Sequence, residues 1–212
     1  YNVDENMKYF AGIGKSSRVP DARELYFKNS TGTYLGNDNL DQTKNYEADI
    51  GFDKTIGTFN VRPKLFYSVL KDYIYNSGTF ENIDAKIYGL DISGFYFMTE
   101  NLSLDYGMAY QRGKKDGDFD DKDLAEIPPL KANLALNYEQ AKAKYTAEVV
   151  AVDSWDSYDS TAKEQELGGY AVVNLKYTNQ LHKNIGLTLG IDNVFDKTYA
   201  STNTYQDVTY VE

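Results

Sequence analysis

The chain has 212 residues, of which 42% are hydrophobic and 15% aromatic, and its formal net charge is −10. This acidity disfavours nucleic acid as a partner, because phosphates require a basic surface. The chain has no cysteine, which excludes disulfides and a cysteine nucleophile, and no apolar run long enough for a membrane helix, which excludes a helical membrane protein.

Segments with the alternation of β-strands recur from one end of the chain to the other. In one of them Ile185, Leu187, Leu189 and Ile191 alternate with glycine, threonine and aspartate, a pattern typical of a strand with two different faces. The sequence predicts about nine strands, at 7–15, 44–54, 58–71, 86–98, 102–112, 129–139, 144–154, 169–179 and 184–193.

The connections between these segments alternate in length. Tight turns are expected near 55–57, 99–101, 140–143 and 179–184, and long connections at 16–43, 72–85, 113–128 and 155–168, with 194–212 as a tail. This order predicts an all-β, antiparallel up-and-down meander that forms part of a transmembrane β-barrel, with short periplasmic turns and long extracellular loops. A Greek-key sandwich would scatter its loop lengths over both ends.

The alternation also predicts which side chains share a face. One face is expected to meet lipid and the other to line a hydrated interior. The predicted lipid face includes Leu102, Leu104, Leu134, Leu136, Leu187 and Leu189, whereas Asp105, Asn133 and Thr188 point the other way. Aromatic residues gather at the tight turns, as expected of a girdle at the lipid interface: Phe59, Tyr138, Tyr145 and Tyr177.

Three stretches together resemble the TonB-dependent outer-membrane receptors: GKSSRVPDARELYF (14–27), GNDNLDQTKNYEADIGFDK (36–54) and LTLGIDNVFDKTYAS (187–201). The resemblance covers essentially the whole chain. It implies the later part of a 22-stranded, plugged barrel in the outer membrane of a Gram-negative bacterium. It also implies a receptor that catalyses no covalent chemistry and imports a scarce nutrient, such as siderophore-bound iron, haem, cobalamin or a metal ion, with energy from TonB.

The family pattern is incomplete in this chain. We expect 1–212 to be a single barrel segment, without the plug domain through which TonB acts and without the closing strand. Its strands at 7–15 and 184–193 should then have open edges, which are costly in lipid or water. Two alternatives are a soluble or surface-attached all-β binding module, such as a lectin-like sandwich, and a smaller complete porin-like barrel. An odd number of strands disfavours the second.

Two loops hold candidate binding residues. Asp116, Asp118, Asp120 and Asp123 have the alternate spacing of a calcium loop, although the glycine and glutamate of an EF-hand are missing and a solvated acidic loop is the competing interpretation. The second loop contains the chain's single tryptophan: Trp155, with Asp156 and Tyr158, could contact an incoming ligand, or Trp155 could belong to the outer aromatic girdle.

Charged residues elsewhere predict structure rather than chemistry. The single histidine, His182, lies in a tight turn, and its spacing implies no catalytic partner. Arg18, Asp21, Arg23 and Glu24 are expected to form an ion-pair cluster that holds the first long loop. The sequence therefore predicts a receptor and not an enzyme, with no cofactor other than calcium in the acidic loop.

Overall fold

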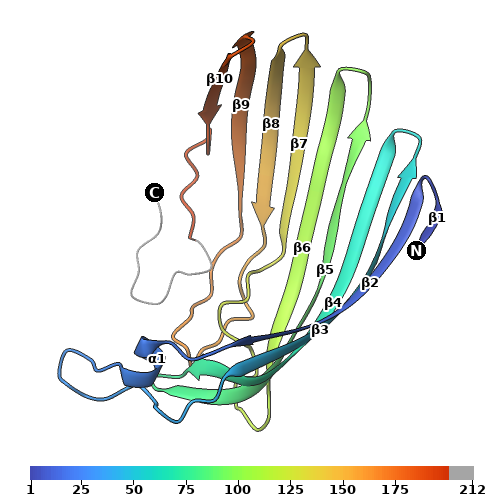
Figure 1. Cartoon of the computed structure of the whole chain (residues 1–212). Coiled ribbons are helices and arrows are strands. Elements are labelled where there is room, and N and C mark those ends of the chain that lie inside the picture. Colours follow the sequence, from blue (N-terminus) through green and yellow to red (C-terminus); the bar gives the residue numbers. More distant parts are fainter. Residues whose placement is uncertain (201–212) are drawn as a thin grey trace.

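A computed structural model describes residues 1–200 of the chain. It forms one sheet of ten strands in which every strand pairs antiparallel with its neighbours in sequence (Figure 1). The strands are β1 (Asn2–Asp4), β2 (Met7–Arg18), β3 (Thr43–Ile56), β4 (Phe59–Asn76), β5 (Phe80–Phe97), β6 (Leu102–Asp116), β7 (Lys131–Gln140), β8 (Ala143–Val152), β9 (Tyr170–His182) and β10 (Ile185–Ile191). The predicted all-β meander is confirmed, and the sandwich alternative is wrong.

The strand count and one connection differ from the prediction. The tenth strand is β1, a short hairpin partner that covers only the start of β2. The predicted long loop at 72–85 is wrong, because β4 and β5 continue through it to a turn at 77–79. A bulge beside Asp72, whose φ is 55°, shifts the register and lets the pairing continue. The part of the predicted tail at 201–212 lies outside the described residues.

The two faces of the sheet are those that the alternation predicts. Leu104 lies directly opposite Leu136 on the neighbouring strand, and Leu134 and Leu189 are 50% and 57% exposed. Exposed leucines in laterally continuous rows have no core to pack against within the described residues, as expected of a lipid-facing surface. On the other face, the Nδ2 of Asn137 donates to Asp105 Oδ2 at 2.8 Å.

Aromatic rings mark two levels on the exposed apolar face. Near the tight turns, the ring of Tyr145 lies 6.3 Å from that of Tyr138 and 5.0 Å from that of Tyr177. Towards the other end, Tyr67 stacks on Tyr88 with ring centroids 6.3 Å apart. Phe59 and Tyr67 of β4 are eight residues apart, which is about 26 Å along a strand. That separation suits strands that cross an apolar layer at a tilt.

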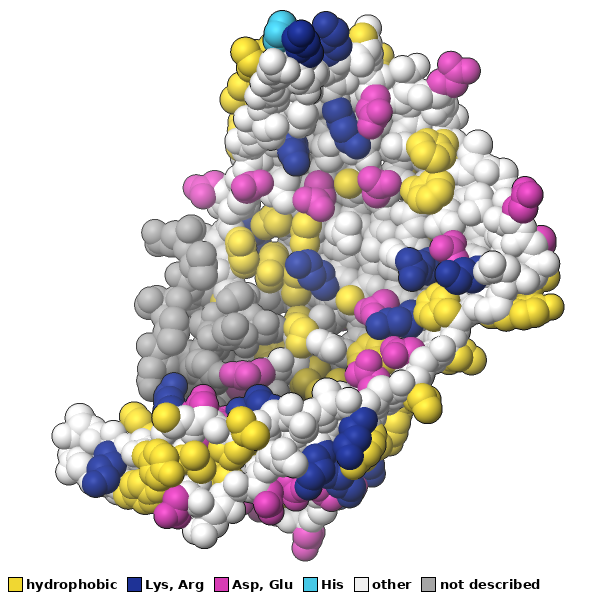
Figure 2. Space-filling model, viewed as in Figure 1, with side chains coloured by type: hydrophobic (Ala, Val, Ile, Leu, Met, Phe, Trp, Pro, Cys, Tyr) yellow, Lys and Arg dark blue, Asp and Glu magenta, His cyan; other side chains and the backbone are white. Residues whose placement is uncertain are grey.

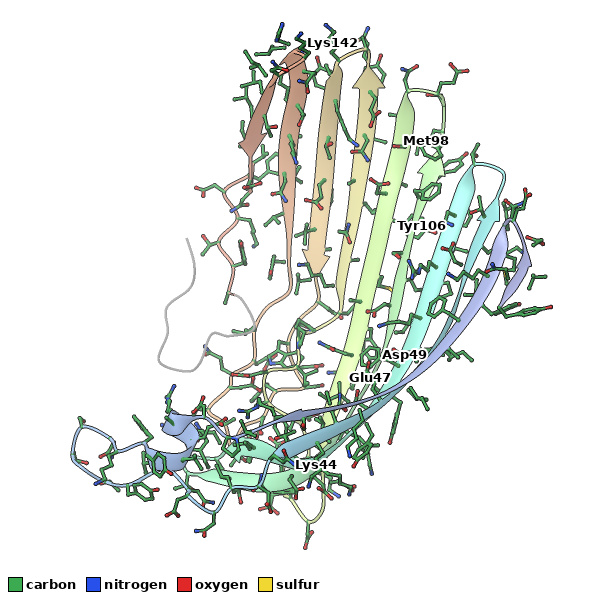
Figure 3. All side chains as sticks on the ribbon, in the orientation of Figure 1. Lys44, Glu47, Asp49, Met98, Tyr106 and Lys142 are labelled. Atoms are coloured by element: carbon green, nitrogen blue, oxygen red, sulfur yellow. The ribbon has the colours of Figure 1, made fainter. Side chains whose placement is uncertain are left out.

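The polar face carries charges that are neutralised across strands. The Nζ of Lys64 lies 3.7 Å from Asp49 and 3.3 Å from Asp91, so that one ammonium group joins three strands. The hydroxyl of Ser68 donates to Glu47 at 2.6 Å. Figure 3 shows Glu47 and Asp49 between Lys44, near the loop end, and Met98 and Lys142, at the tight turns.

Glycine lets an aromatic ring lie flat against the polar face. A Cβ on Gly51 would come within 2.4 Å of the Phe10 ring and within 2.4 Å of the carbonyl oxygen of Pro63. Gly51 pairs directly with Phe10, whose ring covers the gap that the missing side chain leaves. Any side chain at this position would have to displace the ring or the neighbouring backbone.

The buried core of the described residues lies at the loop end of the sheet. There the long strands bend and the loops fold back over them (Figure 1). In Figure 2 hydrophobic side chains gather around this end, while charged side chains spread over the hollowed face. The core cluster contains Leu70, Tyr75, Ile83, Ala85, Leu124, Ile127, Trp155, Leu167 and Ala200. Among the described residues, no helix has both the length and the apolar character needed to cross a membrane.

Candidate binding site at the loop end of the sheet

The candidate site is built from the first long loop, the β4–β5 hairpin, and the loops at 117–130 and 153–169. In β4 and β5, Leu70 and Ala85 are paired and buried, and they lie on the polar side of the sheet. Lys115 of β6 is paired with Ala85 and shares that side. The loops therefore fold over the face that the resemblance assigns to the barrel interior, at the loop end of the sheet, which we call the mouth.

A buried ion pair fixes the loop at 153–169 to the sheet. Lys115 and Asp159 have side chains that are 1% and 0% exposed, and the lysine Nζ donates to Asp159 Oδ2 at 2.9 Å. The same oxygen accepts the hydroxyl of Tyr75 at 2.6 Å, and the lysine Nζ lies 4.8 Å from the centroid of the tyrosine ring. Burying two charges is tolerated only with such geometry and additional hydrogen bonds. We conclude that this pair sets the position of the loop.

A second buried carboxylate joins two loops through their backbones. Glu164 accepts the backbone N–H of Asp159 at 2.8 Å and that of Glu126 at 2.7 Å. Burial raises the pKa of the Glu164 carboxyl above its ordinary value, although both backbone hydrogen bonds oppose this shift. The bond to Glu126 connects the loop after β6 to the loop after β8, and the bond to Asp159 lies within the latter, so that the two loops form one wall.

The first long loop is fixed by a short helix, α1 (Ala22–Tyr26). Asp21 caps it by accepting the backbone N–H of Glu24 at 2.8 Å, and Glu24 accepts the backbone N–H of Asp21 in return. Arg18 donates two hydrogen bonds to Glu24, both at 2.8 Å. These contacts hold the pKa of the Glu24 carboxyl below its ordinary value. The predicted ion-pair cluster is confirmed for Arg18 and Glu24, whereas Asp21 acts as a cap.

Two adjoining cavities lie between these segments. The larger, of about 540 Å³, is lined by parts of α1, β4 and both loops, including Tyr73, Tyr75 and Glu126. The smaller, of about 190 Å³, adds the turn between β4 and β5. Arg23 and Lys163 line both cavities. The larger volume lies in the range that small-molecule sites usually occupy.

The predicted ligand-binding residues occupy different environments. Trp155 is 2% exposed and belongs to the core cluster, so the expectation of an exposed aromatic ring or of a girdle tryptophan is wrong. Its backbone pairs with that of Leu167 in an isolated bridge. Tyr158 packs against the same cluster. Only Asp156 is exposed, at 68% of its side chain, with Arg112 3.9 Å away. Ligand contact by these residues stays a prediction.

The acidic loop does not assemble the predicted calcium site. Asp116 is 2.9 Å from Lys86, and Asp123 is 2.5 Å from Lys114, so lysines hold two of the four carboxylates. Asp118 and Asp120 are exposed. Nowhere in residues 1–200 do three or more acidic or histidine side chains converge as a metal site would require. The spacing suggested convergence, but Asp116 still belongs to β6, where alternation sends its carboxylate outwards to Lys86.

The most informative site residues were not predicted. Lys115 fell inside a stretch predicted to be a loop, and Asp159 was one acid among many in an acidic chain. A weak signal existed for Lys115, since the alternation of β6 continues to Asp116 and places Lys115 on the polar face. Asp159 carried no comparable signal, because its partners Lys115 and Tyr75 are 44 and 84 residues away in sequence.

The arrangement matches a known family of barrels. The family model described as "TonB dependent receptor-like, beta-barrel" matches residues 1–194. The chain belongs to the TonB-dependent receptor family. This membership agrees with the ten-stranded meander, the polar concave face and the loops gathered at one end.

Several individual TonB-dependent receptors resemble this chain. A vitamin B12 transporter, BtuB, of Photobacterium profundum is 26% identical over 97% of the chain and 34% of its own length. A probable hemoglobin and hemoglobin-haptoglobin-binding protein of Haemophilus influenzae is 24% identical over 87% of the chain. The solved structure of the copper transporter OprC superposes with a TM-score of 0.83 at 25% identity, over 95% of the chain and 33% of that protein.

This receptor chain thus spans about a third of the relatives that it matches. The solved structure of a ferric enterobactin receptor mutant from Pseudomonas aeruginosa, at 19% identity and a TM-score of 0.71, supports the fold alone. The relatives named here are transporters and receptors rather than enzymes, in agreement with the prediction from sequence. His182, the single histidine, is exposed at the end of β9, beside the β9–β10 turn and away from the loop end.

Proposed function

We propose that this chain is the loop-bearing part of an outer-membrane receptor that binds a scarce nutrient at the cell surface and imports it with energy from TonB. The observation that carries the proposal is the cavity of about 540 Å³ at the mouth of the concave face, walled by loops that a buried ion pair fixes. A fixed wall lowers the entropy cost of ordering loops on binding.

The cargo class follows from the family and from the ligand chemistry of the mouth. Relatives include receptors named for cobalamin, haem proteins, ferric siderophores and copper. Bare copper suits this chain poorly, because soft ligands are scarce: three methionines, one histidine and no cysteine. Of these, Met98 lies in a tight turn, and His182 is the last residue of β9 before another. Met7 begins β2, next to a third tight turn, and Met108 lies in the middle of β6 on its apolar face. A metal chelate, haem or cobalamin therefore fits the mouth better than a free copper ion.

The experiment measures uptake by cells that make the full-length receptor containing this chain. The probes are ⁵⁵Fe-labelled siderophores, haemin and ⁵⁷Co-labelled cyanocobalamin, each tested with and without a functional TonB. We expect one probe to accumulate only when both the receptor and TonB are present. Lys163→Glu, in both cavities, should reduce that uptake, whereas Lys183→Glu, in a tight turn, should not. Uptake that is the same with and without a functional TonB would contradict the proposal. So would the absence of uptake of every probe by a correctly inserted receptor.

A further inference from the structure

The smaller of the two cavities at the mouth differs in charge from the larger one. Among the described residues, its lining contains two basic side chains, Arg23 and Lys163, and no acidic one. The larger cavity is lined by three basic and three acidic side chains, so that its charges balance. The chain as a whole has a net charge of −10 and does not attract anions. The smaller cavity is therefore a local basic site in an acidic protein.

The two basic side chains of this cavity are exposed and lack an acidic partner. Arg18, on the same loop as Arg23, is held by Glu24, and Lys115 is held by Asp159. Within residues 1–200, neither Arg23 nor Lys163 forms an ion pair. An unpaired guanidinium or ammonium group has hydrogen-bond donors left for a ligand.

Lys163 is carried on a turn that the buried ion pair anchors. Its backbone φ is 63°, a left-handed conformation that lysine seldom adopts. The N–H groups of its neighbours Ala162 and Glu164 both donate to the carbonyl oxygen of Asp159, at 3.2 and 3.3 Å. The side chain of Asp159 is bonded in turn to Lys115. Such conformations persist only where the surroundings hold them, and they cluster at ligand sites.

Two aromatic rings stand beside these cations in the lining. The Cζ of Arg23 lies 5.2 Å from the centroid of the Phe27 ring, so that the guanidinium lies over that ring. Phe80 provides the second ring, from the start of β5. Its N–H donates to the carbonyl oxygen of Leu35 at 3.4 Å, and Asn37 Nδ2 donates to its carbonyl oxygen at 3.1 Å. These bonds join the first long loop to the β4–β5 hairpin, beside which α1 lies in Figure 1.

The smaller cavity has room for one part of a ligand. Its volume of about 190 Å³ is below the range of about 300–1,000 Å³ that complete small-molecule sites occupy. The adjoining cavity of about 540 Å³ lies within that range. Phe27, Leu35 and Phe80 give the smaller cavity an apolar wall next to its two cations. A group that satisfies both features has a flat apolar body and an anionic end.

We propose that the smaller cavity is a subsite for an aromatic ring that bears a carboxylate, carried as one arm of the cargo. The carboxylate accepts hydrogen bonds from the guanidinium of Arg23 and the ammonium of Lys163, and the ring packs against Phe27 and Phe80. Arginine suits this role because its planar fork can donate two parallel bonds to a carboxylate. The inference rests on the proposed function, since it names the chemical class of ligand for the same mouth.

The experiment measures binding in vitro, so that its result does not depend on transport. The full-length receptor containing this chain is purified in a mild detergent and titrated with 4-fluorobenzoate. Binding is followed by the ¹⁹F NMR line width of the probe, corrected for detergent alone. The comparison probe is 4-fluorobenzamide, which has the same shape without the charge. We expect the carboxylate to bind about tenfold more tightly than the amide, the effect of one net charge-assisted hydrogen bond.

Variants of the two cations show whether they cause this preference. Arg23→Gln/Lys163→Gln should abolish the preference for the carboxylate and leave binding of the amide unchanged. Lys163→Arg keeps the charge and should keep the preference. The matched control Lys28→Gln/Lys122→Gln removes two exposed lysines from neighbouring loops that line neither cavity, and it should also keep the preference.

Four results would overturn the subsite: equal binding of the two probes by the wild type, binding of neither probe, a preference that survives in Arg23→Gln/Lys163→Gln, or the same loss in the lysine control. A failure of the proposed function would look different. It would appear as uptake that does not depend on TonB, while binding in detergent still depends on the charge of the probe.

Discussion

Replacing Asp159 by asparagine tests whether the buried ion pair positions the loop at the mouth. The variant keeps the shape of the side chain but leaves the ammonium group of Lys115, whose side chain is 1% exposed, without its counter-ion. Removing one partner of a buried pair costs about 3–5 kcal/mol. Lys115 retains the Tyr75 hydroxyl at 3.2 Å and the tyrosine ring. We therefore expect the lower end, about 3 kcal/mol.

The assay is hydrogen–deuterium exchange at the backbone amides that close the loop. The N–H of Trp155 donates to Leu167 at 2.8 Å, and the N–H of Leu167 donates to Trp155 at 3.1 Å. A loss of about 3 kcal/mol in docking free energy should raise their exchange rates about 100-fold, while amides in the centre of β7 and β8 keep theirs. The effect stays local because the strand ladders do not depend on the loop.

Two further variants make this result decisive. Asp156→Asn changes an aspartate three residues away that is 68% exposed, and it should alter exchange by less than about threefold. Lys115→Met combined with Asp159→Leu removes both charges, and it should restore most of the protection. Unchanged exchange in Asp159→Asn, or an equal effect in Asp156→Asn, would refute a positioning role for the pair.

Four other predictions follow from the structure. Spin labels at Leu136 and Asn137, in lipid, should differ in contact with lipid-soluble oxygen; equal values would refute the assignment of faces. Because the pKa of Glu24 is lowered, its contribution is present above the ordinary value of 4.5 and disappears as pH falls through the folded pKa. The protection of the α1 amides, taken as exchange relative to the intrinsic rate at each pH, should therefore fall below pH 4.5 in the wild type, and Glu24→Gln should flatten that dependence. Gly51→Val should destabilise the folded chain by about 1–3 kcal/mol in urea unfolding, since a Cβ there meets atoms at 2.4 Å. Titration calorimetry with calcium should show no heat of binding for the wild type or for Asp118→Asn. Heat released by the wild type alone would instead support the predicted calcium site.

The sequence alone determined the sheet, its two faces and the order of its strands. Successive side chains on a strand point to opposite sides, so the alternation of Leu134 and Leu136 with Asn133 and Asn137 assigns each residue to a face without knowledge of the neighbouring strand. The order of short and long connections then favours a meander with short turns at one end and long loops at the other, although the connection predicted to be long at 72–85 is a short turn. The family resemblance rests on motifs of the same local kind.

Only the tertiary structure decided what the loops do. Lys115 and Asp159 meet because β6 runs past the predicted end of the strand and the loop after β8 folds back over it. Trp155 is buried for the same reason, although its acidic neighbours in sequence suggested exposure. Local periodicity cannot predict such contacts, since the free energy of a buried ion pair or a packed ring depends on segments that converge only after the strands have bent.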